Sequence, residues 1–482
     1  MIQIGIWGRF EANFINSKQY KDPYSNVELK VNFTAPDGDV IEYWGFYDGE
    51  NSWKVRFMPD MTGVWRYTGF FTDDEEQLEG QFECIPSDIP GLIHKDENNP
   101  IWFGFKGGKH FMMRSFHVGD RFFADNWEDQ KRTAFLDWIQ EHQYNTLSIA
   151  SHYLNRDKMD RGLGWKTPRL WPLDSAEYRK TEKILDELEQ RRIVVYPFAG
   201  FFGRESYFPT SKKDQVKYIK YVLARLGAYW NLLLNVSGPE PLMPNNPFMT
   251  KEILDNLGRV VQEHNVFGHL VTVHNATSKE FFRNEDYIDY TTLQGPKTTD
   301  RKRLLAETLE FRKENCPVYS QETLWPGNNL HPEYSDEDIR KNAVVLLMSA
   351  AAINVGDMDG DSSSGFSGTM DICEAVESRH EIIGKIWDFF ESIGYYKLTP
   401  SPNLVDHGFC LADEGSEYLV YLEDGGTVNL QLTEGEYEMQ WINARNDYER
   451  TENKEIQGSS FTAPDNNDWL LYIKKKGTDG SI

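Results

Sequence analysis

The feature that most constrains the fold is a regular alternation of short apolar runs and helical patterns between residues 109 and 393. The run over residues 231–236 places Leu232, Leu233 and Leu234 in succession, which is typical of a parallel strand buried on both faces. Eight runs are expected as strands: residues 110–117, 145–150, 193–198, 231–236, 270–273, 290–293, 317–320 and 353–355. Amphipathic helical patterns are expected at residues 181–189, 212–226, 251–264 and 336–350, and a closing helix at 374–393. Eight strands alternating with helices predict a (β/α)8 TIM barrel.

Both ends of the chain show the two-residue period of β-strands instead. Residues 27–33 read V-E-L-K-V-N-F, and residues 53–57 alternate in the same way. Near the other end, residues 417–422, 427–432 and 437–442 alternate, and residues 468–475 are expected as the last strand. A chain of 482 residues is also too long for a single core. We therefore expect a multidomain α/β protein with three domains: an N-terminal β-sandwich (1–92), a barrel (93–397) and a C-terminal β-sandwich (398–482).

Two predicted strands end in a glutamate. Glu322 follows the run 317–320 before Pro326 and Gly327 stop the strand, and Glu240 follows the run 231–236 after Gly238 and Pro239. In a barrel, residues at the carboxyl ends of the strands are where catalytic groups lie. Paired carboxylates suit glycoside hydrolysis, because one can donate a proton while the other attacks or activates water.

Composition narrows the classes of partner. A net charge of −25 argues against nucleic acid, which needs clustered Lys and Arg, and against anionic membranes. The four cysteines are scattered without a CxxC spacing, so no zinc or redox site is expected. They fit a reducing compartment, and with no visible signal peptide we expect a cytoplasmic location. The acidic loop 357–361 fails the EF-hand pattern, so no metal is expected.

Several motifs resemble a bacterial family of glycosidases that has an N-terminal β-module, an apiosidase-like barrel and a small C-terminal β-domain. The resemblance starts at residues 7–11, 45–49, 56–59 and 63–67, and it covers essentially the whole chain. Within the barrel it is carried by residues 151–155, 269–275, 293–294 and 317–327. It implies the retaining clan of glycoside hydrolases, with the two carboxylates after strands four and seven. One departure is that Pro239 precedes Glu240, where that clan has Asn, and the nearest Asn is Asn235.

The resemblance and the predicted strand ends together give a candidate site. Its catalytic residues are Glu322, as nucleophile, and Glu240, as acid/base. His274 and Asn275 are expected either to bind substrate hydroxyl groups, to orient Glu322 or to form a structural pair. Trp325 is expected either to stack on a sugar or to belong to the core. The full set of substrate-binding candidates is His152, Tyr153, Asn155, Asn235, His274, Asn275, Gln294 and Trp325.

The function expected from these residues is hydrolysis of an O-glycosidic bond by a retaining double displacement, on a plant- or algal-type oligosaccharide, polysaccharide or glycoside. No cofactor is needed, the partner is the carbohydrate, and a homo-oligomer is left open. A non-catalytic carbohydrate-binding protein on a decayed barrel, an inverting hydrolase and a transglycosylase are the alternatives. Carboxyl groups about 5–5.5 Å apart would indicate retention, and about 6.5–9.5 Å inversion. The sequence does not identify the sugar, its anomeric configuration or exo against endo action.

Overall fold

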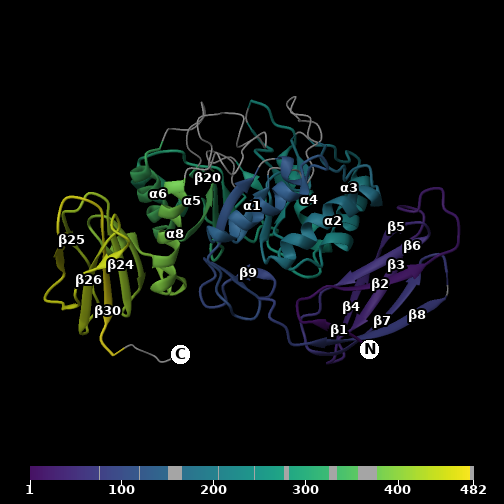
Figure 1. Cartoon of the computed structure of the whole chain (residues 1–482), viewed down its shortest axis with the longest axis horizontal. Helices are drawn as coiled ribbons and strands as arrows, with labels where there is room; N and C mark the ends of the chain where they lie inside the picture. The colour runs from purple at the N-terminus through teal and green to yellow at the C-terminus, as the bar shows by residue number, and fades with distance from the viewer. Residues whose placement is uncertain are drawn as a thin grey trace.

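A computed structural model of the chain describes residues 1–74, 76–118, 120–149, 166–204, 206–243, 245–275, 282–324, 334–356 and 377–477. The protein is a multidomain α/β structure. Its helices and parallel strands occupy the middle of the molecule, with the N-terminal strands on one side and the C-terminal strands on the other (Figure 1).

The N-terminal strands form two sheets that share one aromatic core. The first sheet has the order β1-β8-β7-β3-β4 and the second β2-β6-β5. Alternation within β3 follows the expected period, because every second residue is buried. Phe33 stacks on Phe57 of the other sheet with ring centroids 4.0 Å apart. The strands are β1 (Ile2–Gly5), β2 (Phe10–Ile15), β3 (Leu29–Thr34), β4 (Val40–Trp44), β5 (Phe46–Gly49), β6 (Ser52–Phe57), β7 (Gly63–Phe71) and β8 (Gln77–Ile85).

A buried ionic network attaches this part to the central helices. Glu182 of helix α2 (Ser175–Gln190) accepts hydrogen bonds from Arg56 of β6, at 2.7 Å, and from Arg225 of helix α3 (Lys212–Leu226), at 2.9 Å. Arg225 also pairs with Asp48 at 2.8 Å. The network lies in the interior of the contact between the N-terminal strands and the central helices and not on its rim, because its three members Arg56, Glu182 and Arg225 are all buried.

A hairpin of β9 (Ile93–Lys95) and β10 (Phe103–Phe105) packs against the amino ends of the central strands. His110 bridges to Gly104, and the Phe111 N–H donates to Phe103. The run predicted over 110–117 therefore begins by pairing with this hairpin, and the central strand β11 starts only at Arg114 (Arg114–Val118).

The central sheet contains seven parallel strands in the order β13-β12-β11-β21-β20-β19-β18. Beyond β13, Val195 forms a parallel bridge to Leu232, and β15 pairs in parallel with β17. The predicted fourth and fifth strands are each divided into two short pieces. The bounds are β12 (Thr146–Ile149), β13 (Val194–Pro197), β14 (Phe202–Gly203), β15 (Leu234–Asn235), β16 (Ser237–Gly238), β17 (Val271–Thr272), β18 (His274–Asn275), β19 (Thr291–Leu293), β20 (Val318–Leu324) and β21 (Ala351–Val355).

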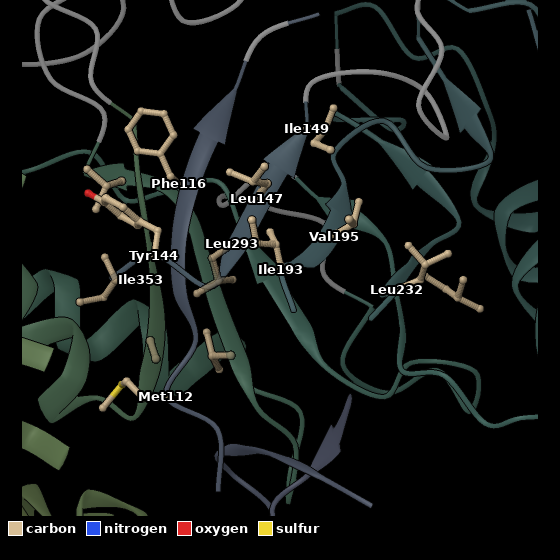
Figure 2. Packing of buried hydrophobic residues seen from close by; sticks show 14 of the residues in the cluster. Met112, Phe116, Tyr144, Leu147, Ile149, Ile193, Val195, Leu232, Leu293 and Ile353 are labelled. Carbon is tan, nitrogen blue, oxygen red and sulfur yellow. The ribbon is translucent and has the colours of Figure 1, made fainter. Parts of the chain in front are cut away.

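Helices cover the outer face of these strands. Phe116 lies opposite Leu147, and Leu147 opposite Val195, so apolar side chains at one level of neighbouring strands form a continuous layer. Figure 2 shows labelled members of this core cluster. The helices are α1 (Asp129–Glu141), α2, α3, α4 (Lys251–His264), α5 (Arg301–Phe311), α6 (Asp336–Met348) and α8 (Glu377–Ser392). The predicted helices 212–226 and 251–264 are confirmed with the same bounds, whereas α1 and α5 were not among those predicted.

Side-chain caps fix where several helices begin. Ser211 accepts a hydrogen bond from the Asp214 N–H at the start of α3, and Thr250 caps α4 through the Ile253 N–H. Ser335 and Asp338 form a reciprocal capping box on α6. Such caps satisfy backbone N–H groups that the first helical turn leaves unpaired, and they therefore end each preceding loop at a defined residue.

The C-terminal strands form a sheet of order β22-β23-β24-β30-β26-β27 with β28 beside β26, and a small β25-β29 pair. The predicted strand 417–422 is confirmed as β24. Asp468 joins this part to α6 through two bonds of 3.0 Å from Arg340. The strands are β22 (Thr399–Pro400), β23 (Phe409–Asp413), β24 (Glu417–Leu422), β25 (Thr427–Asn429), β26 (Tyr437–Asn443), β27 (Glu449–Arg450), β28 (Lys454–Glu455), β29 (Ser460–Thr462) and β30 (Trp469–Lys475).

Candidate active site

Strand β20 carries Glu322, and an irregularity in its pairing decides where that side chain lies. Ser320 lies opposite Ile353 of β21, but the next paired residue is Leu324, opposite Val355. Four residues on β20 therefore span the distance of two on β21, which is a β-bulge. Gln321 donates to Ser148 Oγ on β12 at 2.9 Å, while Glu322 contacts Lys297. Consecutive residues that would point to opposite faces of a regular strand thus both reach polar partners on other segments of the central region.

Glu322 is a fully buried carboxylate with one close cation. Lys297 Nζ lies 2.7 Å from Glu322 Oε2. Burial raises the pKa of the Glu322 carboxyl above its ordinary value. The positive charge and hydrogen bond of Lys297 and a hydrogen bond from Gln294 act to lower this pKa, and the negative charge of Glu240 acts to raise it. A buried carboxylate without such partners would be strongly destabilised, so Lys297 favours the ionised form of Glu322 against the effect of burial.

His274 on β18 is a buried neutral ring. Burial, opposed by a hydrogen bond to the Phe198 carbonyl, lowers the pKa of His274 to about 3. Its Nδ1 lies 3.2 Å from the Phe198 carbonyl oxygen, and its Nε2 lies 3.8 Å from Glu322 Oε1. The ring is uncharged at any ordinary pH, so it forms no ion pair with Glu322. The hydrogen bonds to the Glu322 carboxylate come from Lys297 and Gln294.

Glu240 follows β16 in a left-handed backbone conformation, with φ of 51°. Its N–H donates to the His274 carbonyl oxygen at 3.0 Å, and its own carbonyl accepts from Arg204 at 2.7 Å. A non-glycine residue is held in this conformation only where its surroundings determine it, and such residues gather at functional sites. The negative charge of Glu240 is near enough to be one of the influences that raise the pKa of Glu322.

Asn235 is an internal brace. Its Nδ2 donates to the carbonyls of Pro197, at 3.1 Å, and Phe198, at 2.8 Å. Its Oδ1 accepts from the N–H groups of Ser237, at 3.2 Å, and His274, at 3.1 Å. All the hydrogen-bonding capacity of this side-chain amide is therefore used by backbone. Asn235 positions the segments that carry Glu240 and His274.

The structure brings together Glu322, Gln294 and His274, with Glu240 close enough to act on the pKa of Glu322. His152, Tyr153, Asn155 and Trp325 lie outside the described residues. Asn275 pairs through its backbone with Leu293, and its side chain is not among those described.

The sequence analysis missed Lys297 and Gln321. Lys297 lies three residues beyond Gln294, after Gly295 and Pro296, where the predicted sixth strand ends. The available signal was physical: a carboxylate at a buried strand end needs a compensating cation, and a lysine beside the neighbouring strand end can supply it. The sequence analysis did not select Gln321, because in a regular strand its side chain would point to the face away from that of Glu322.

Within the described ranges, no group of three or more His, Cys, Asp or Glu side chains is placed to hold a metal ion. The acidic loop 357–361 lies outside these ranges. Cys84, Cys316 and Cys410 are buried free thiols. None of the described helices has both the length and the apolar composition that a membrane span requires.

One family model matches the chain. It is a domain of unknown function, DUF5060, and it covers residues 3–72, which include the strands β1 to β7. A search of curated protein sequences gave no match.

Solved structures resemble all or most of the chain. A "putative glycoside hydrolase" from Bacteroides vulgatus ATCC 8482 has a TM-score of 0.74 at 18% identity, covering 98% of this chain and 100% of that one. A glycoside hydrolase family 5 protein from the same organism has a TM-score of 0.60 at 14% identity, covering 81% and 95%. A further structure, described as a glycoside hydrolase, has a TM-score of 0.60 at 12% identity, covering 82% and 99%. At these identities the likeness concerns the fold, which this chain shares with glycoside hydrolases.

Proposed function

We propose that this protein is a retaining glycoside hydrolase with Glu322 as nucleophile and Glu240 as acid/base. The observation that carries the proposal is a fully buried carboxylate, paired with Lys297 at 2.7 Å and within range of the negative charge of a second carboxylate, Glu240. Two carboxyl groups in different environments suit this chemistry, since one must be ionised when the other is protonated. The shared fold with glycoside hydrolases supports the same reaction class.

The proposed reaction has two displacements at one carbon. Glu322 Oε1 attacks the anomeric carbon while the bond to the leaving oxygen breaks, and Glu240 gives its proton to that oxygen. A glycosyl ester on Glu322 results. Water then attacks the same carbon and gives its proton to Glu240, and the ester bond breaks to restore both carboxyl groups. Retention follows from the two inversions.

The architecture proposed for this enzyme is a closed (β/α)8 barrel between two β-sandwiches, with domains at 1–92, 93–397 and 398–482. The bridge from Val195 to Leu232 and the pairing of β15 with β17 support closure, because they link β13, at one end of the seven-stranded sheet, to the segment that continues into β18 at the other end. Closure would place Glu240 and Glu322 at the same rim. A plant- or algal-type carbohydrate as substrate and a cytoplasmic location stay predictions from the sequence.

The test is turnover of 4-nitrophenyl glycosides of glucose, galactose, mannose, xylose and arabinose in both anomeric forms, together with plant and algal oligosaccharides. We expect release of a product whose first-formed anomer, followed by NMR, has the substrate's configuration. Inverted product would show that water attacks directly. Binding without turnover across the panel would favour a carbohydrate-binding protein.

A further inference from the structure

The hydrogen bond of His274 to the backbone defines which ring nitrogen carries the proton. The partner of Nδ1 is the Phe198 carbonyl oxygen at 3.2 Å, and a carbonyl oxygen can only accept a hydrogen bond. Nδ1 must therefore hold the hydrogen. Since burial keeps the ring neutral, with a pKa of about 3, Nε2 has no hydrogen and presents a lone pair.

This lone pair faces another acceptor. His274 Nε2 lies 3.8 Å from Glu322 Oε1, and both atoms are buried without a hydrogen-bond partner among the described residues. The other carboxylate oxygen, Oε2, is already paired with Lys297. At 3.8 Å the two acceptors are too far apart to share a proton directly. A hydroxyl group seated between them has one hydrogen and can donate it to only one of the two acceptors at a time, and a buried acceptor without a donor is costly.

We propose that His274 Nε2 accepts a hydrogen bond from the substrate hydroxyl on the carbon next to the anomeric carbon, and that His274 thereby selects sugars in which this hydroxyl is free. The inference rests on the proposed function, because Glu322 Oε1 must be the atom that attacks. An oxygen bonded to the neighbouring carbon then lies beside Oε1 and within reach of Nε2.

The same contact favours the transition state. As Oε1 forms its bond to the anomeric carbon, it loses negative charge and competes less for the hydroxyl hydrogen. The sugar meanwhile gains positive charge, so the hydroxyl becomes a better donor to Nε2. Hydrogen bonds at this hydroxyl that strengthen in the transition state contribute several kcal/mol in glycosidases. His274 is in this view a hydrogen-bond acceptor for the substrate.

The experiment is a double-mutant cycle with the fastest 4-nitrophenyl glycoside of the panel and its 2-deoxy counterpart. His274→Asn keeps an amide N–H near the Nδ1 position and removes the acceptor, while His274→Gln places an amide oxygen near Nε2. We expect His274→Asn to lower kcat/KM for the hydroxylated substrate by about 10- to 100-fold, the effect of one strong hydrogen bond. It should change the 2-deoxy substrate by less than about threefold, and His274→Gln should restore part of the difference.

An independent readout separates this inference from the proposed function. NMR of ¹⁵N-labelled histidine, with the His274 signal assigned from its loss in His274→Asn, should show a neutral ring protonated at Nδ1 between pH 5 and 9. An Nε2–H tautomer or a charged ring would overturn the inference even in an active hydrolase. So would equal losses on both substrates in a folded His274→Asn variant. Absence of wild-type turnover on the whole panel would overturn the proposed function, and with it the role of the hydroxyl, whatever the tautomer.

Discussion

Removing the charge of Lys297 should shift the pH range in which the enzyme works. Lys297 Nζ lies 2.7 Å from Glu322 Oε2, and opposite charges at that distance attract by about 6 kcal/mol at an effective dielectric constant of about 20. Loss of hydration by the lysine, whose side chain is 21% exposed, reduces the net effect. An opposite charge so near a carboxyl group typically lowers its pKa by about 1 to 3 units, or about 1.4–4 kcal/mol.

The direction in which the pKa of Glu322 changes when Lys297 is replaced follows from the groups that face Glu322. His274 is neutral, Glu240 acts to raise the pKa of Glu322, and burial holds the Tyr196 phenol in its neutral form. Lys297 is the cation that opposes burial. Lys297→Met should therefore raise the pKa of Glu322 and leave it protonated, and unable to attack, over a wider acidic range. We expect the acidic limb of kcat/KM to move to higher pH by about 1 to 3 pH units.

The assay is the pH profile of kcat/KM on the fastest aryl glycoside, because this parameter reports the free enzyme. Lys297→Arg should retain most of the wild-type profile, since it keeps a positive charge. Lys302→Met, which removes an exposed lysine of α5, is the matched control and should leave the acidic limb in place. An unmoved acidic limb in a folded Lys297→Met variant would refute the reasoning, as would an equal loss at every pH.

Three further outcomes follow from the same geometry. Glu322→Gln should lower kcat by about four orders of magnitude or more while circular dichroism shows an intact fold, since it removes the nucleophile at almost constant size. Glu240→Ala should slow substrates with poor leaving groups by about 10²- to 10⁴-fold and activated aryl glycosides much less, measured as kcat/KM across leaving-group pKa. Glu182→Ala should lower the free energy of unfolding, measured in urea, by about 3–5 kcal/mol, because it leaves the buried Arg56 and Arg225 without their shared carboxylate.

Each of these has an outcome that contradicts it. Wild-type kcat in folded Glu322→Gln would remove the nucleophile from this position. Equal losses of Glu240→Ala on both classes of leaving group would point to another acid, with Glu205, outside the described residues, as the first to test. Glu187→Ala, on the less buried side of the same helix, is the control for Glu182→Ala. If both substitutions lower the free energy of unfolding by the same amount, the ionic network is not what stabilises the contact between the N-terminal strands and the central helices.

The sequence predicts most of the elements whose limits are set locally. Helix α3 begins where Ser211 can cap it and α4 where Thr250 can, and both have a clear apolar face, so their bounds followed from nearby residues. The limits of β24 also follow from turn residues on both sides, although all six of its residues are buried and not every second one as the predicted alternation implied. Glu322 at the end of an apolar run was predicted for the same reason, and its buried position is what the structure adds.

Features set by distant residues were not predicted. The fourth and fifth strands break into short pieces where the Asn235 amide bonds to the backbone of both neighbouring segments, which no local pattern encodes. The pairing of Lys297 with Glu322 depends on the path of a loop and the reach of a long side chain. The bulge in β20 shifts Gln321 inward only because of its partner strand. Helix α1 was missed in part because the buried face includes Arg132, a residue normally read as exposed.

The buried network around Glu182 has a consequence for how such proteins can recombine. One of its arginines belongs to the N-terminal strands, and the other charges that contact Glu182 belong to the central helices. Exchanging the first 92 residues for those of a relative would remove Arg56 from Glu182 and Asp48 from Arg225, so the buried Glu182–Arg225 pair would lose its outer partners unless the incoming segment carried an arginine and a carboxylate at these two positions. The two parts are therefore expected to be inherited as a single unit. A library that exchanges residues 1–92 between relatives should recover folded chimaeras only from parents that share this triad.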